Sequence, residues 1–378
     1  MDFALTEEQE SIRDLARQIF SENATHERLL ELAKSEDWFD LSLWQQLVEA
    51  NLPGVALPED CGGSGFGPIE LCLVFEELGR HVAQVPLFAT AALGAAPIAE
   101  FGTPDQQARW IKRVVDEGAI LTAALSEVGS SVPSVPRVMA RREGDSYRLD
   151  GEKQCVPAGL LAAGILVPAR FGDGVGLFML DPQAEGVSLE RQITTSGEPQ
   201  ARLILDGAVV SADDLIGDPS RGAQMVEWIV ERASLALSAM QVGVAEGALR
   251  DTAAYVSERK QFGRPIATFQ GVALRAADAY IDVEAMRSTV YQAAWRLAEG
   301  KPAAAEISSA KWWAAMGGMR VVHTAQHLHG GIGSDIEYPI HRYFLAAKQN
   351  ELLFGSANQQ LAKLGARLVS DQPARSEA

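Results

Sequence analysis

The chain has 378 residues, 47% of them hydrophobic and 22% charged, which is typical of a globular protein with two or three domains. The net charge of −17 argues against a nucleic-acid-binding protein, because such proteins present a basic surface. No apolar run reaches the roughly 20 residues of a membrane span, the start lacks a signal-peptide pattern, and three widely spaced cysteines suit a reduced, cytoplasmic protein.

Residues 1–118 have the periodicity of α-helices. Thr6 and Gln9 match a capping box at the start of one helix, and the segments 69–83 and 103–118 continue the helical pattern. We therefore predict an N-terminal helical domain over residues 1–118.

Residues 119–221 change to the periodicity of strands. Asp150-Gly151 is a hairpin signal, and two apolar runs flank a second turn at Gly172-Asp173-Gly174. These patterns predict a β-barrel-like middle domain over residues 119–221.

Long helical runs return over residues 222–368 and predict an antiparallel four-helix bundle. The last residues, 369–378, are predicted to form a disordered tail. The expected fold class is therefore α+β, in which a helical domain, a β domain and a helical bundle follow one another along the chain.

Two segments resemble a known family. YVSERKQFGRPIATFQ, residues 255–270, resembles the first flavin-contacting block of the acyl-CoA dehydrogenases, and HLHGGIGSDIEYPIHRYF, residues 327–344, resembles their second block. ALPEDCGGSG and FEELGR resemble the family's N-terminal domain, so the resemblance covers nearly the whole chain. It implies an FAD-dependent oxidoreductase of lipid metabolism that catalyses α,β-dehydrogenation of an acyl-CoA thioester.

In this family each FAD is held by two chains, and one of them reaches across to the flavin of its neighbour. The resemblance implies that this chain supplies such contacts, and that His327 stands where the family has glutamine. The residues that would reach across, called the reaching residues below, are Arg259, Phe262, Gln270, His327, Gly330 and Gly331.

The positions that would hold the chain's own flavin depart from the family pattern. The family's ring-contacting Trp-Ile-Thr reads Cys155-Val156-Pro157, which lacks the flat aromatic surface, the hydroxyl group and one backbone N–H. The loop LSEVGSSV, residues 125–132, only partly matches the family's Thr-Glu-Pro-x-Ala-Gly-Ser-Asp. The catalytic carboxylate before Gly-Thr is replaced by Phe354.

Because these losses fall in one half of the site, we expect a chain without its own base that completes the FAD site of a catalytic homologue. The expected assembly is an α2β2 heterotetramer in which the partner binds FAD and the acyl-CoA. The second block also resembles actinobacterial dehydrogenases of steroid side-chain degradation, which suggests a steroid side-chain CoA ester as substrate.

Two alternatives stay open at this stage. The chain could be a self-sufficient homo-oligomeric dehydrogenase whose base has moved to Glu351 or Glu231, or it could be a non-catalytic scaffold with the same fold. His323 and His327 have the spacing of metal ligands on a helix, but no third ligand lies nearby in the sequence. No metal site is therefore predicted.

Overall fold

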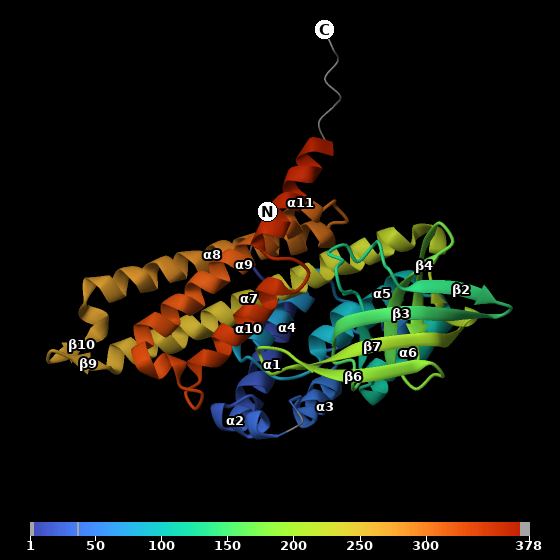
Figure 1. Cartoon of the computed structure of the whole chain (residues 1–378). Coiled ribbons are helices and arrows are strands. Elements are labelled where there is room, and N and C mark those ends of the chain that lie inside the picture. The colour runs from blue at the N-terminus through green and yellow to red at the C-terminus, as the bar shows by residue number, and fades with distance from the viewer. Residues whose placement is uncertain (1–3, 36–37, 371–378) are drawn as a thin grey trace, which may run out of the picture. The chain divides into compact units, whose positions relative to one another are not determined.

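The computed structural model describes residues 4–35 and 38–370, which form two compact units (Figure 1). Helices, then strands, then helices follow one another along the chain, so the predicted α+β fold class is confirmed. The predicted domain boundaries at residues 118 and 221 stay predictions, and most of the predicted tail lies outside the described residues. Unit 1 comprises Met1–Leu30, Pro68–Ala83 and Ser234–Ala378, and unit 2 comprises Glu31–Gly67 and Gln84–Ala233.

The first N-terminal helix begins where the sequence supplies a capping side chain. The predicted capping box is confirmed, because Thr6 Oγ1 accepts the N–H of Gln9 at 3.2 Å and Gln9 Oε1 accepts the N–H of Thr6 at 3.0 Å. The helical elements are α1 (Glu7–Asn23), α2 (His26–Lys34), α3 (Leu41–Glu49), α4 (Pro68–Arg80), a π-helical segment (Phe88–Ala95), α5 (Ala96–Phe101) and α6 (Pro104–Glu117).

Unit 2 contains a mixed sheet with the strand order β6-β7-β3-β2-β4-β5-β8, and β1 pairs in parallel with β4. Its central strands are buried on both faces, as the consecutive and fully buried Leu166 and Val167 of one strand show. The strands are β1 (Leu121–Ala123), β2 (Met139–Glu143), β3 (Ser146–Pro157), β4 (Gly164–Phe171), β5 (Gly174–Leu180), β6 (Val187–Ile193), β7 (Pro199–Ser211) and β8 (Leu215–Ile216).

The hairpin predicted at Asp150-Gly151 is wrong. These residues lie inside β3, and the turn between β2 and β3 falls earlier, between the paired residues Glu143 and Ser146. Gly151 has a φ of 134° where the register against β7 shifts, so the glycine marks a bulge in a continuing strand. A local Asp-Gly pattern cannot distinguish a bulge from a turn.

Unit 1 contains most of the long C-terminal helices. Within it α9 packs against α8, α10 and α11, and an apolar core includes Val244, Val322 and Ile340. None of the helices in residues 4–35 and 38–370 has both the length and the hydrophobicity to cross a bilayer. The elements are α7 (Gly222–Glu258), which begins in unit 2, β9 (Lys260–Gln261), β10 (Arg264–Pro265), α8 (Gln270–Ala298), α9 (Ala304–His329), α10 (Ile340–Leu352) and α11 (Ala357–Ser370).

Helices α4 and α7 touch backbone to backbone at two glycines. A Cβ on Gly79 would lie 1.9 Å from the carbonyl oxygen of Met240, and a Cβ on Gly243 would lie 1.8 Å from that of Glu76. Neither position can therefore carry a side chain without moving a helix. This contact brings the charged end of α4 against Glu246 of α7.

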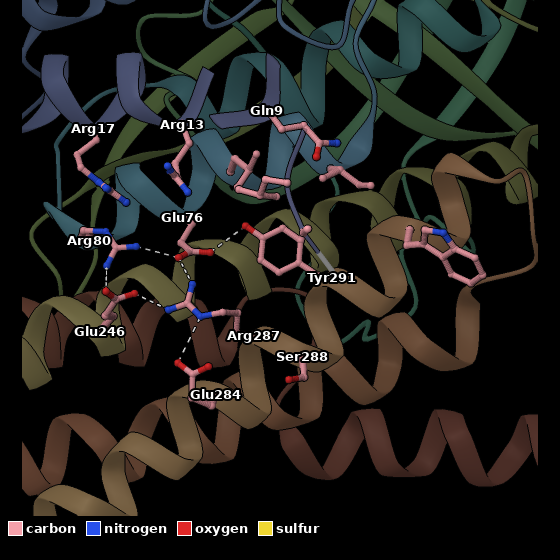
Figure 2. A pocket seen from close by; sticks show the side chains of 15 residues that line it. Gln9, Arg13, Arg17, Glu76, Arg80, Glu246, Glu284, Arg287, Ser288 and Tyr291 are labelled. Atoms are coloured by element: carbon pink, nitrogen blue, oxygen red, sulfur yellow. Dashed lines mark hydrogen bonds and ion pairs between the residues drawn. The ribbon is translucent and has the colours of Figure 1, made fainter. Parts of the chain in front are cut away.

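A partly buried ionic network ties α4 to α7 and α8 (Figure 2). Arg80 binds Glu76 at 2.8 Å and Glu77 at 3.0 Å, and it also pairs with Glu246. Arg287 of α8 pairs with Glu76 and Glu246. Burial alone would raise the pKa of Glu246, but Arg80 and Arg287 outweigh it and lower that pKa to about 2. The network therefore stays charged at neutral pH.

Replacing Arg80 with methionine should lower the unfolding free energy of the chain by about 3–5 kcal/mol, because buried carboxylates lose their cation. Urea unfolding followed by circular dichroism measures this loss. The matched control is Arg141→Met, whose ion pair with Asp150 is largely exposed and should contribute less than about 1 kcal/mol. Equal stability of the two variants would contradict the role assigned to the network.

Candidate functional site

The connection between α7 and α8 is a tight hairpin with an unusual turn. β9 and β10 pair in the register Gln261↔Arg264, which leaves Phe262 and Gly263 as the turn. Both have positive φ, 52° and 77°, as a type I′ turn requires. The first such position normally holds Asn, Asp or Gly, and a bulky residue there is strained. The side chain of Phe262 is also 92% exposed, so contacts within the chain do not explain its presence.

The structure holds this exposed ring in a defined place. The Phe262 ring lies edge-on to the Phe269 ring at a centroid distance of 6.2 Å. The guanidinium of Arg264 lies over the Phe269 ring, 4.3 Å from its centroid. The N–H of Ile266 donates to the carbonyl oxygen of Arg259 at 2.8 Å and closes the hairpin base. Sequence reasoning missed the roles of Arg264 and Phe269; two apolar rings flanking a Gly-Arg turn were the available signal.

Three polar reaching residues keep their side chains available. Arg259, Gln270 and His327 are all exposed, and their side chains make no hydrogen bond or ion pair with any described residue. Gln326, the neighbour of His327, differs because its Nε2 donates to the carbonyl oxygen of Gly333 at 3.0 Å. Gln326 is thus bound to the backbone that follows α9, and His327 is the neighbouring residue whose side chain stays exposed.

Gly330 and Gly331 form an uncovered backbone segment after α9. Gly330 has φ 67° and ψ −141°, a conformation that is essentially restricted to glycine. Apart from the glycine itself and its chain neighbours, no atom of the described residues lies within 4 Å of the position of an added Cβ at either glycine. A ligand or another chain could therefore approach the backbone closely here.

Both groups of reaching residues lie at the same end of the helical bundle. Tyr255, one turn before Arg259, stacks on His329 at a centroid distance of 4.4 Å, and His329 directly precedes Gly330. His329 Nδ1 contacts the carbonyl oxygen of Ala325 at 2.8 Å, and burial lowers the pKa of this histidine. A neutral, buried His329 thus joins the ends of α7 and α9.

The segment Cys155-Val156-Pro157 in unit 2 uses its polar groups within the chain. The N–H of Cys155 donates to Gln192 Oε1 at 3.0 Å, and the carbonyl oxygen of Pro157 accepts from Thr122 Oγ1 at 2.7 Å. Cys155 itself has a strained positive φ of 51° at an irregularity of β3. This segment offers a flavin ring neither an aromatic surface nor a free donor from these groups.

The loop formed by residues 125–132 also makes polar contacts within the chain. Glu127 accepts from the buried Lys153 at 2.7 Å and from the N–H groups of Arg137 and Val138 at 2.6 and 3.1 Å. Burial lowers the pKa of Lys153, and the charge of Glu127 opposes that shift. Glu127 therefore secures the loop on the sheet.

Phe354 lies in the turn between α10 and α11. Its φ is 57° and that of Gly355 is 110°, and the carbonyl oxygen of Phe354 accepts from Gln360 Nε2 at 3.0 Å. The ring is half-buried and contains no group that can accept a proton. Phe354 therefore lies in a tight turn, and its own side chain cannot act as a base there.

The two alternative base candidates are both carboxylates on helices. Glu351 of α10 accepts from Lys348 at 2.5 Å, and Lys311, whose pKa burial lowers to about 7, donates to the backbone oxygen of Glu351 at 3.1 Å. Glu231 lies half-buried in the part of α7 that belongs to unit 2. Within the described residues no three metal-ligand side chains gather around a common point.

Comparisons with known proteins agree on one family. Residues 6–118 match the model "Acyl-CoA dehydrogenase, N-terminal domain" and residues 220–369 the model "Acyl-CoA dehydrogenase, C-terminal domain". Acyl-CoA dehydrogenase FadE27 of Mycobacterium tuberculosis is 39% identical over 99% of this chain and 100% of its own length. Acyl-CoA dehydrogenase FadE28 of the same organism is 32% identical over 97% of this chain and 99% of its own.

Solved structures agree with these relatives. A chain of the Tcur3481-Tcur3483 steroid ACAD variant has a TM-score of 0.90 and 45% identity, covering 96% of this chain and 98% of its own. A chain of the ChsE4-ChsE5 complex from Mycobacterium tuberculosis has a TM-score of 0.92 and 40% identity, covering 99% and 100%. Butyryl-CoA dehydrogenase of Megasphaera elsdenii has a TM-score of 0.91 and 28% identity, covering 98% and 100%.

Replacing Phe262 with asparagine should raise the unfolding free energy of the chain by roughly 0.5 kcal/mol. Relief of a strain of about 1–2 kcal/mol exceeds the loss of an exposed ring contact of about 0.5–1.5 kcal/mol. Chemical denaturation measures the change, and Gly263→Ala, at a φ of 77°, should lower stability instead. A loss of more than about 1 kcal/mol in Phe262→Asn would show that the ring serves the chain's own stability.

Proposed function

The chain belongs to the acyl-CoA dehydrogenase family, and from this premise we propose that it completes the FAD site of a homologous partner chain. The family consists of oxidoreductases that act on CH–CH bonds with FAD as cofactor. In the proposed arrangement the partner supplies the base, the flavin-ring contacts and the acyl-CoA site. This chain supplies the reaching residues.

The observation that carries the proposal is a difference between the two halves of the site. Among the reaching residues, Arg259, Gln270 and His327 have uncommitted side chains, and the ring of Phe262 is 92% exposed. In the other half, Cys155, Pro157 and Glu127 are engaged within the chain. A chain that served only its own flavin would need both halves.

The reaching residues fit an FAD by their chemistry. Arg259 and His327 offer donors suited to a diphosphate, Gln270 offers an amide, and Phe262 offers an apolar surface. Gly330 and Gly331 let the backbone approach closely, because no side chain intervenes. Held by these residues, a bound FAD would supply the hydride acceptor for the dehydrogenation. This chain would hold the cofactor and exclude water from it, while proton removal falls to the partner.

The half that would hold the chain's own flavin does not fit. Pro157 has no N–H, Cys155 has no flat ring and Phe354 has no carboxylate. Two of the solved structures above carry the names of two different chains, at 45% and 40% identity. These names support a mixed assembly, for which we propose α2β2 stoichiometry. The word steroid in the first name supports a bulky steroid side-chain CoA ester as the partner's substrate.

The flavin content of the purified protein tests this proposal. Expressed alone, the chain should contain little FAD, as measured by absorbance in the flavin bands after denaturation. Co-expressed with a homologue that has an intact Trp-Ile-Thr and a glutamate or aspartate base, it should purify with that homologue and with bound flavin. Near-stoichiometric FAD in the lone chain would overturn the proposal.

Arg259→Ala should weaken flavin retention by the assembled complex about tenfold to hundredfold. The change removes a charged donor, and hydrogen bonds to charged groups contribute roughly 1.5–3 kcal/mol. Flavin release during dilution, followed by fluorescence, measures retention apart from turnover. Lys260→Ala is the matched control, because it removes an adjacent exposed cation from the same hairpin. Equal flavin retention in both variants would show that the positive charge of the hairpin, and not a specific contact of Arg259, holds the flavin.

The displaced-base alternative predicts a different result. If Glu351 or Glu231 were the base, Glu351→Gln or Glu231→Gln would abolish turnover while flavin stayed bound. We expect both variants to turn over normally in the assembled complex with saturating substrate, because Glu351 is held by Lys348 and the partner carries the base. The remaining alternative is a non-catalytic scaffold. In that case, replacing Arg259 would not change flavin retention by the complex.

A further inference from the structure

Unit 1 contains a pocket of about 550 Å³ that the proposed function does not use (Figure 2). This volume lies in the range of small-molecule sites, about 300–1,000 Å³. Side chains of four helices line it: the evenly spaced Gln9, Arg13 and Arg17 of α1 face residues of α4, α7 and α8. Their spacing of four residues puts the three side chains on one face of α1.

The pocket is apolar at one end and charged at the other. The apolar lining residues are separated from the charged ones along the helices: Ile69 and Leu73 precede Glu76 and Arg80 on α4, and Trp295 follows Arg287 about two turns later on α8. At the charged end, Figure 2 shows the guanidinium groups of Arg13 and Arg17 pointing from α1 toward Glu76 and Arg80. A ligand that fits this gradient has an apolar body and one polar head.

The lining carboxylates are already neutralised within the chain. Glu76 accepts from Arg80, Arg287 and Tyr291. Glu246 accepts from Arg80, Arg250 and Arg287, and Glu284 lies 3.5 Å from Arg287. These groups have little capacity left for a cationic ligand.

The spare capacity lies with the donors of α1. Among described residues, Arg13 makes hydrogen bonds and ion pairs only with Asp14, its neighbour in the chain, so part of its guanidinium stays unused. Arg17 binds Glu77 at 2.9 Å, and its side chain is 43% exposed. A ligand head in this position must therefore accept hydrogen bonds, and guanidinium donors favour a carboxylate.

We propose that this pocket is a binding site for an amphipathic carboxylate. The carboxylate head lies on Arg13, with Arg17 one helical turn away, and the apolar body lies against Leu73, Ile69 and Trp295. The nearby Asp14, Glu77 and Glu284 limit the head to a single negative charge, because a dianion would meet stronger repulsion. The site is separate from the reaching residues and independent of flavin.

Isothermal titration of decanoate into the purified full chain tests this site. Saturable binding at one site per chain is expected, and Arg13→Gln should weaken it about tenfold or more, since a charged hydrogen bond is lost. Decanol, which has the same body without the charge, should also bind at least about tenfold more weakly. Ile69→Ser should weaken decanoate binding as well, because it shortens the apolar wall.

The matched control is Arg109→Gln, an exposed arginine of unit 2 that pairs with Asp214 and should leave the affinity unchanged. Circular dichroism of each variant confirms that it is folded. Absence of saturable binding to the parent chain, or equal affinity in Arg13→Gln and the parent, would overturn the proposal. Equal binding of decanol and decanoate would overturn it too, because the head would then have no partner.

Discussion

The contact of α4 with α7 is the constraint on which unit 1 depends. Gly79 and Gly243 allow the two backbones to touch, and Arg80 then joins Glu76 to Glu246 inside the unit. Burying these charges is unfavourable unless every group is paired, so the network admits one arrangement of the helices. Arg287 extends the same pairing to α8. The reaching residues and the pocket beside Arg13 both belong to this unit.

Fixed helices allow strained or unpaired groups to persist at their ends. Phe262 and Phe354 both have positive φ, 52° and 57°, and both lie in turns that close long helices. The ring of Phe262 is exposed where a partner would use it in the proposed arrangement, and Phe354 stands where the family resemblance implies a base. The free donors of Arg259, Gln270 and His327 lie beside the first of these turns, at one end of the bundle.

Charge pairing also separates the two kinds of arginine in this chain. Arg80 and Arg287 are saturated by carboxylates and act in packing, whereas Arg259 and Arg13 have donors in excess of their partners. The same residue type is thus structural or available for binding according to its neighbours. An acidic protein with a net charge of −17 can still present local sites for anions in this way.

The order of helical and strand segments, the cap at Thr6 and the family motifs around Arg259 and Gly330 were determined by the sequence itself, because they rest on local periodicity and spacing. The absence of a carboxylate at Phe354 was equally a matter of residue identity. The bulge at Gly151, the positive φ of Phe262, the stack of Arg264 on Phe269 and the pocket beside Arg13 were decided only by the tertiary structure. Each of these depends on which distant residues meet: β7 against β3, Phe269 against the turn, and four separate helices around one cavity. Local sequence patterns do not contain such contacts, since pairing, strain and spare hydrogen-bonding capacity arise only after the chain has packed.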